Sequence, residues 1–178
     1  LCSGLTLEAC VSHLKSIKGV RARLEKVKNR RGLNIFVDFA HTEDALANVL
    51  TTLKRVKQGK LITVFGCGGD RDREKREKMG RVVCRLSDEA IVTNDNPRSE
   101  DPEKIAAQIL KGFENDYPVH LQLDRRKAIR RAIELANPED ILLIAGKGHE
   151  NEQIFAHQII PFDDKEVVQE ICAEKVGA

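Results

Sequence analysis

The residues best suited to chemistry lie in four polar loops, each of which follows a short apolar run. The most informative loop is residues 94–98. Arg98 can grip a carboxylate with two parallel hydrogen bonds, while Asp95 can accept from an ammonium group. Pro97 fixes one backbone dihedral and biases Asn96 to an extended conformation, so these side chains can point at a common target. Such a set fits an amino acid, which carries both groups; an ordinary turn capped by a surface arginine is the alternative.

A second loop, residues 66–73, combines glycines with both signs of charge. Gly66, Gly68 and Gly69 leave the backbone free to turn sharply and let a ligand approach closely. The spacing is not the dinucleotide fingerprint G-x-G-x-x-G, because Arg71 stands at the position of the third glycine. The loop is therefore either a ligand-binding turn or a tight strand-to-helix connection with solvated charges.

Two further loops contain a histidine. Asp38 could accept hydrogen bonds from ribose hydroxyls, and His41 could stack on or hydrogen-bond to a nucleotide, although both residue types also stabilise loops at helix starts. Residues 146–150 are not a Walker A loop, because its first glycine is missing and Gly148 replaces the Ser or Thr that would hold Mg²⁺. This loop can still expose backbone groups and the carboxylate of Glu150.

Short apolar runs and helical patterns alternate along the chain and place these loops. Strands are predicted at 33–39, 60–65, 89–93, 119–121 and 140–144. Helices are predicted at 5–17, from Thr42 to Gly59, at 74–86, from Asp101, at 124–135 and from Asp163. Residues 20–28 are predicted to be a charged connection, and 153–155 with 158–160 a small hairpin.

This alternation predicts an α/β fold with a doubly wound, mostly parallel sheet. Parallel strands would gather the four loops along one edge, where open α/β folds bind ligands. The predicted convergence supports a functional site more strongly than any single loop does.

The composition sets limits on the class of protein. The chain has 178 residues, 41% of them hydrophobic and 33% charged, with a net charge of +2 that gives no argument for nucleic acid or a membrane surface. Aromatic residues make up only 4%, so base-stacking platforms are not expected. The five cysteines are odd in number and form no C-x-x-C pair, which indicates free thiols in a reducing cytoplasm and not a disulfide framework or a zinc site.

Taken together, the four loops resemble the Mur ligases. The motifs Asp-Phe-Ala-His-Thr at 38–42, Phe-Gly-Cys-Gly-Gly-Asp-Arg-Asp at 65–72, Asp-Asn-Pro-Arg at 95–98 and Ala-Gly-Lys-Gly-His-Glu at 145–150 occur in the same order in that family. Within it, the resemblance is to the members that add meso-diaminopimelate. It implies that residues 23–178 form a Rossmann-like C-terminal domain and that 1–22 are the tail of a central domain. Folylpolyglutamate synthase shares an Asp-x-Ala-His motif but does not use the Asp-Asn-Pro-Arg set.

The resemblance implies an ATP-dependent ligase of peptidoglycan precursor synthesis. ATP would phosphorylate a carboxylate of UDP-MurNAc-L-Ala-D-Glu, and the amine of meso-diaminopimelate would attack the acyl phosphate to form an amide. The family's P-loop and carbamylated lysine lie in the central domain, which would bind most of the ATP and Mg²⁺. The leading alternative of another class is a free-standing domain that binds a nucleotide or small ligand without chemistry.

The resemblance also assigns roles to residues of this chain. Arg23, Asp38 and His41 would contact ATP. No residue here is expected to be catalytic or to bind metal, and a cytoplasmic monomer that binds neither nucleic acid nor membrane is expected. The residues expected to hold meso-diaminopimelate are Arg71, Asp95, Asn96, Pro97, Arg98, Gly146 and Glu150.

Overall fold

The structure is a computed structural model that describes residue 4, residues 6–14 and residues 20–174. The first helix, predicted at 5–17, is present as α1 (Leu7–Leu14), with Leu7 and Val11 exposed. Its predicted end at Gly19 lies outside the described residues.

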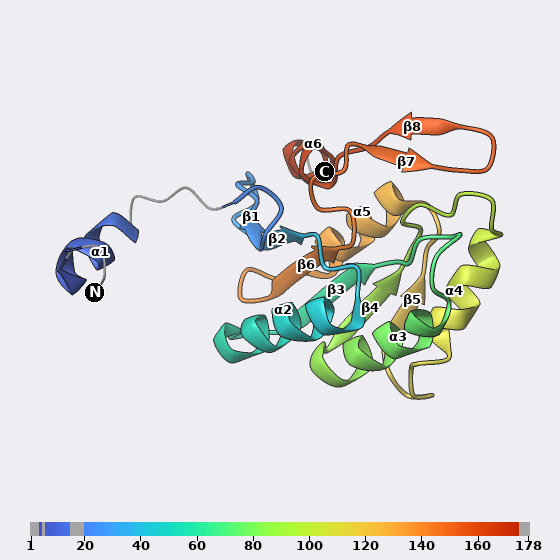
Figure 1. Ribbon diagram of the computed structural model, residues 1–178, viewed down its shortest axis with the longest axis horizontal. Helices are drawn as coiled ribbons and strands as arrows, with labels where there is room; N and C mark the ends of the chain where they lie inside the picture. Colours follow the sequence, from blue (N-terminus) through green and yellow to red (C-terminus); the bar gives the residue numbers. More distant parts are fainter. Residues whose placement is uncertain (1–3, 5, 15–19, 175–178) are drawn as a thin grey trace.

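The centre of the molecule is a six-stranded sheet in the order β1-β2-β6-β3-β4-β5 (Figure 1). All neighbouring strands are parallel except β1, which pairs antiparallel with β2 at the edge. The predicted strands are confirmed to within a residue at each end. β1 was not predicted: residues 20–28 are not simply a connection, because two polar residues in them pair with β2. The strands are β1 (Glu25–Lys26), β2 (Asn34–Asp38), β3 (Leu61–Phe65), β4 (Glu89–Val92), β5 (Val119–Leu121) and β6 (Ile141–Ala145).

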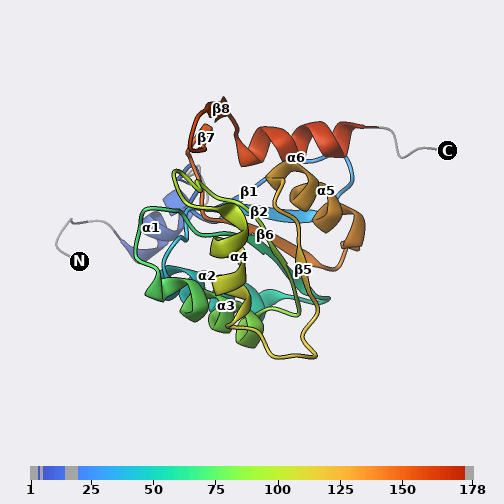
Figure 2. The ribbon, with the colours of Figure 1, turned by 90° about the vertical axis from the view of Figure 1, so that its right-hand side faces the viewer.

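Helices cover both faces of this sheet (Figure 2). One face packs against α2 (Glu43–Val56), α3 (Glu74–Leu86) and α4 (Pro102–Leu110). The other packs against α5 (Arg125–Leu135) and α6 (Asp164–Ala173). The predicted doubly wound α/β fold is therefore confirmed. β3 and β6 are fully buried along their length, as expected of strands covered on both faces.

The predicted helix starts are confirmed by their capping hydrogen bonds. The side chain of Thr42 accepts from the backbone N–H of Ala45, and Asp101, Asp124 and Asp163 accept in the same way at the starts of α4, α5 and α6. Each such cap is worth about 1 kcal/mol. The helix α4 ends at Leu110, so Phe113, which the helical pattern predicts on its core face, lies beyond it and packs against Phe65 from the following turn.

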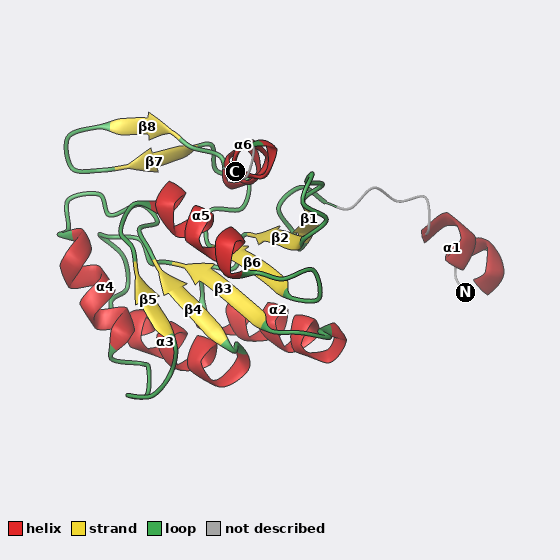
Figure 3. Ribbon diagram, turned by 180° about the vertical axis from the view of Figure 1, so that it is seen from behind, coloured by secondary structure: helices red, strands yellow, loops and turns green. Residues whose placement is uncertain are grey.

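A small antiparallel hairpin, β7 (Glu152–Ile154) and β8 (Ile159–Pro161), lies outside the main sheet (Figure 3). This confirms the predicted hairpin. Its first strand is tied to the loop after β4, because Arg98 N–H donates to the carbonyl of Ile154 at 3.0 Å and Ile154 N–H donates to Asn96 Oδ1 at 3.1 Å.

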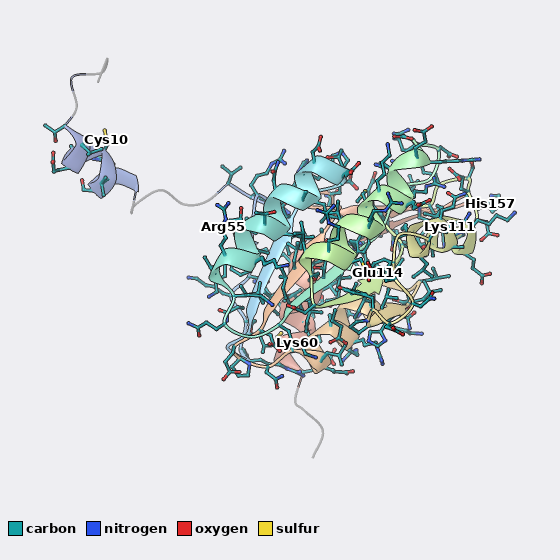
Figure 4. All side chains as sticks on the ribbon, turned by 90° about the horizontal axis from the view of Figure 1, so that it is seen from below. Cys10, Arg55, Lys60, Lys111, Glu114 and His157 are labelled. Atoms are coloured by element: carbon teal, nitrogen blue, oxygen red, sulfur yellow. The ribbon has the colours of Figure 1, made fainter. Side chains whose placement is uncertain are left out.

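Side chains with nitrogen and oxygen atoms at their tips extend outward in the view of Figure 4. Arg55, Lys111 and Glu114 are among the exposed side chains. Across the described ranges, no helix is long and apolar enough to span a bilayer.

Candidate functional site

The four polar loops meet at the carboxyl edge of the sheet, as predicted. β6 lies between β2 and β3, so the order of the strands reverses there, and a ligand crevice is expected at such a point. A pocket of about 400 Å³ opens at this place and is lined by residues from all four loops. Of the predicted site residues, those lining it are His41, Arg71, Asp95, Asn96, Arg98, Gly146 and Glu150. Arg23, Asp38 and Pro97 lie outside its lining.

The glycine loop after β3 is shaped by its neighbour. A Cβ on Gly66 would lie 2.2 Å from the carbonyl oxygen of Thr93, and one on Gly69 would lie 1.9 Å from that of Pro97. The two glycines therefore let the loop after β4 approach, and do not directly serve a ligand. Gly69 N–H also donates to the carbonyl of Asn96 at 2.9 Å, which joins the two loops into one wall of the pocket.

Arg98 is held by its backbone and by one end of its guanidinium. Its φ of 52° lies in the left-handed region, and its Nη1 donates to the carbonyl of Gly69 at 2.8 Å. Among the described residues, its Nε and Nη2 have no hydrogen-bond acceptor, so they remain available to a ligand carboxylate. Arg71 is exposed at the same pocket, and its Nη1 donates to the carbonyl of Asp70 at 3.0 Å.

A buried polar cluster forms the floor of the pocket. The side chain of Lys147 is 0% exposed, and its Nζ donates to Asn96 Oδ1 at 2.9 Å and to Glu150 Oε2 at 3.2 Å. Asn96 Nδ2 donates to the same Glu150 oxygen at 2.8 Å. Asp95 Oδ1 lies 3.6 Å from Lys147 Nζ and is a buried acceptor without a hydrogen bond. Burial raises the pKa of Asp95, against the nearby positive charges of Arg125 and Lys147.

Beneath this cluster, Arg125 and Asp164 form an ion pair in which both side chains are 0% exposed. The guanidinium donates to both carboxylate oxygens at 2.8 Å. It also donates to the carbonyls of Asn94 at 3.2 Å and Ala145 at 3.1 Å. The pair therefore fixes the ends of β4 and β6, and with them the loops that carry Asp95 and Glu150.

The residues predicted to contact ATP lie at and beside the loop after β2. Asp38 is buried, and its two carboxylate oxygens accept from Leu24 N–H at 2.6 Å and Ala40 N–H at 2.8 Å. The rings of Phe39 and His41 lie 4.5 Å apart, and the Arg23 guanidinium lies 5.3 Å from the centre of the Phe39 ring.

His149 joins the same group, 5.0 Å from Phe39. Arg23 and His149 are exposed. We call Arg23, Phe39, His41 and His149 the Phe39 cluster.

The structure adds three residues that sequence reasoning missed. Arg76 is 0% exposed and binds both oxygens of Glu100, at 2.8 and 3.0 Å, which ties α3 to the loop after β4. Lys75 lines the pocket and donates to the carbonyl of His41 at 2.9 Å. Lys147 was considered only as part of a rejected phosphate loop, yet the glycines on both sides of it, at φ of 117° and 55°, were a signal for an unusual backbone that turns it inward.

The described residues contain no group of three or more His, Cys, Asp or Glu side chains placed to hold a metal ion. In the pocket, the Glu150 carboxylate is bound by Lys147 and Asn96, and Asp95 lies beside Lys147. These residues do not fit a Mg²⁺ site, so we assign no step of the chemistry in this chain to the metal.

Comparison with known proteins places this geometry in a family. Residues 22–148 match the family "Mur ligase, glutamate ligase domain". The UDP-N-acetylmuramoyl-L-alanyl-D-glutamate–2,6-diaminopimelate ligase of Lawsonia intracellularis is 52% identical over 86% of this chain and 32% of its own length. That of Chlamydia felis is 49% identical over 96% of this chain and 35% of its own. The chain thus spans about a third of the length of these relatives.

Solved structures agree. A UDP-N-acetylmuramoyl-L-alanyl-D-glutamate–2,6-diaminopimelate ligase superposes with a TM-score of 0.81 at 41% identity, covering 96% of this chain and 35% of that one. A folylpolyglutamate synthase of Mycobacterium tuberculosis complexed with ADP has a TM-score of 0.62 at 23% identity, covering 80% of this chain and 33% of that one; it shares the fold alone. The chain is thus more similar to the diaminopimelate ligases than to this folylpolyglutamate synthase, as the Asp-Asn-Pro-Arg motif predicts. The chain therefore belongs to the Mur ligase family, as its four loop motifs predict.

Proposed function

We propose that this chain is the C-terminal domain of an ATP-dependent ligase that joins meso-diaminopimelate to UDP-MurNAc-L-Ala-D-Glu. Its relatives at 46–52% identity carry the name of that ligase. The observation that carries the proposal in this chain is the pocket itself, which is lined both by the guanidinium groups of Arg71 and Arg98 and by the carboxylates of Asp95 and Glu150. The domain would span residues 23–178, and residues 1–22 would belong to the preceding domain.

The charges of the pocket suit a zwitterionic amino acid. Asp95 and Glu150, when ionised, carry two negative charges against the single positive charge of Lys147, so this side is one positive charge short. An ammonium group supplies that charge and donates to the unpaired oxygen of Asp95. Arg98 and Arg71 offer donors to the carboxylates, and meso-diaminopimelate has two of each group.

The domain contributes by positioning, which is where much of the rate of a two-substrate reaction can arise. The carboxylate of UDP-MurNAc-L-Ala-D-Glu accepts the γ-phosphoryl group of ATP. The free amine of the bound amino acid then attacks the acyl carbon, an amide bond forms, phosphate leaves and the amine loses a proton. The nucleotide is contacted by Arg23, Asp38 and His41 of this domain. The residues of the pocket hold the amine of the amino acid towards the acyl phosphate.

The far end of the substrate explains the choice of amino acid. Meso-diaminopimelate carries there a second carboxylate that L-lysine lacks. Arg98 is the group best placed to bind this second carboxylate. Arg71 would bind the carboxylate nearer the reacting amine. A charge-assisted contact contributes about 1.5–3 kcal/mol, or roughly 10- to 150-fold in affinity. Lysine would leave Arg98 unpaired, which widens the difference.

We place the reaction in the cytoplasm, carried out by a monomer. The four cysteines that the structure describes are free, which suits a reducing compartment.

The experiment is phosphate release by the full-length protein that carries this chain, given ATP, Mg²⁺ and UDP-MurNAc-L-Ala-D-Glu. Release is expected only when meso-diaminopimelate is added, and not with L-lysine or D-glutamate. A folded protein that binds meso-diaminopimelate without releasing phosphate would support the non-catalytic alternative and overturn the proposal.

A further inference from the structure

The loop after β6 turns a lysine under the pocket instead of into solvent. Gly148 has a φ of 55°, and a Cβ there would lie 2.6 Å from Phe39 Cβ, so only glycine lets the loop pack this closely. Gly146, with a φ of 117°, makes the other half of the turn. Lys147 lies between the two glycines and is fully buried, so its four-carbon aliphatic chain lies inside the protein.

Lys147 fixes the direction of two pocket side chains. Asn96 Oδ1 accepts from Lys147 Nζ at 2.9 Å and from Ile154 N–H at 3.1 Å, so the amide oxygen points inward and the amide nitrogen faces Glu150. Glu150 Oε2 in turn accepts from both Lys147 and Asn96. Without the ammonium group, Asn96 would lose one of its two acceptor contacts and Glu150 its only ionic partner among the described residues.

Lys147 also sets the charge of the cluster. Its ammonium group faces two carboxylates, Asp95 and Glu150. The nearby guanidinium of Arg125 forms an ion pair with Asp164. Removing that ammonium group would leave both carboxylates without the cation that they share.

We propose that Lys147 is a positioning residue for the incoming amino acid: it orients Asn96 and Glu150 and places its ammonium group between them and Asp95, without itself touching the substrate. This rests on the proposed function, because it assumes that the pocket holds an amino acid. Interior networks of this kind support a binding site when every member is satisfied, and they lose their order when one is removed.

The test uses Lys147→Met in the full-length ligase, because methionine fills a similar volume without the charge. The KM for meso-diaminopimelate is expected to rise about 10- to 150-fold, the range for a buried charged contact. The KM for ATP is expected to stay unchanged, because the contacts of the Phe39 cluster given above do not include the Lys147 side chain. A purely structural role would lower the melting temperature and the active fraction, and would leave the KM for the amino acid unmoved.

Lys57→Met is the matched control. Lys57 pairs with Asp88 beside the start of β3, at the opposite edge of the sheet from the pocket. That variant is expected to lose some thermal stability and to keep both KM values. Should Lys147→Met fail to fold, Lys147→Gln, which keeps a donor for Asn96 and loses the charge, is measured by the same criterion.

The outcomes separate the two proposals. If the wild-type protein shows no phosphate release that depends on added meso-diaminopimelate, the proposed function is refuted. An active wild type whose KM for meso-diaminopimelate rises less than about tenfold in Lys147→Met would refute the role of Lys147 alone.

Discussion

The two sides of the pocket are built in different ways. On the amino-acid side, Lys147, Asn96, Asp95 and Glu150 form a mostly buried cluster whose partners all lie in this chain. On the nucleotide side, the Phe39 cluster consists of ring and cation contacts at the surface, each worth about 0.5–1 kcal/mol at exposed sites. The first side is held by buried contacts in the absence of a ligand, whereas the second has few such supports. In the proposed ligase, another part of the protein would complete the second side.

The frames beneath the pocket strengthen this contrast. The Arg125–Asp164 pair fixes the strand ends under the amino-acid side, and the Arg76–Glu100 pair ties α3 to the loop of Arg98. On the nucleotide side, the comparable support is the carboxylate of Asp38, which binds two backbone N–H groups. The difference supports the proposal that this chain selects the amino acid and only assists in binding ATP.

The largest expected effect concerns the chain by itself. Its sequence contains no Walker A motif, and the Phe39 cluster has no group that surrounds a triphosphate. The purified 178-residue chain should therefore release no phosphate when given ATP, Mg²⁺ and both other substrates. Phosphate release above the background of a reaction without the chain would mean that the nucleotide side is complete in this chain. It would contradict the difference between the two sides of the pocket.

The next largest effect is on stability, through Asp164→Asn. Removing one partner of a buried ion pair leaves the other charge uncompensated, which costs about 3–5 kcal/mol. Urea unfolding of the variant and of wild type would measure this. The control is Glu170→Gln, since Glu170 pairs with Arg126 at the surface and such pairs are worth about 0–1 kcal/mol. If both variants lost the same free energy of unfolding, the buried Arg125–Asp164 pair would contribute no more to stability than a surface pair.

A smaller effect follows from the hydrogen bonds of Arg76, which lower the pKa of Glu100 from 4.5 to about 2. Because the pKa in the folded state is depressed, the stabilisation is present above pH 4.5 and is lost as the pH falls towards about 2.

Glu100→Gln should therefore flatten the loss of unfolding free energy over that interval, as measured by urea titrations at several pH values. An unchanged slope would mean that Glu100 is not held ionised by Arg76.

The smallest effect is expected on the nucleotide side. Asp38→Ala in the full-length ligase should raise the KM for ATP by the loss of one hydrogen bond, about 0.5–1.5 kcal/mol, and leave the KM for meso-diaminopimelate unchanged. Because Asp38 also holds Leu24 and Ala40, thermal melting must confirm that the variant is folded. A folded variant with unchanged ATP dependence would make Asp38 a purely structural residue.

Local rules were enough to predict most of the fold. The strands that are buried on both faces appear in the sequence as continuous apolar runs, and Thr42, Asp101, Asp124 and Asp163 mark helix starts by the chemistry of capping. β1 escaped prediction because its two residues, Glu25 and Lys26, are polar and join the sheet only by pairing with an edge strand.

The loops of the site were predictable, but their inner supports were not. Strand alternation alone implied that four loops would share one edge. The contacts of Lys147 with Asn96 and of Arg76 with Glu100 join distant parts of the chain. The glycines beside Lys147 were a signal for an unusual backbone, but the sequence does not indicate which side chains Lys147 would meet. The packing role of Gly66 and Gly69 was not predicted for the same reason, since the atoms that they accommodate belong to the loop after β4.

The measurement that tests the account most directly is kcat/KM for meso-diaminopimelate and for L-lysine, in full-length wild type and in Arg98→Ala. Wild type should prefer meso-diaminopimelate, and Arg98→Ala should lose about 10- to 150-fold of that preference, because the freed Nε and Nη2 donors of Arg98 are the groups proposed to bind the second carboxylate. A wild type that prefers lysine, or a folded Arg98→Ala enzyme that keeps full discrimination, would contradict the account.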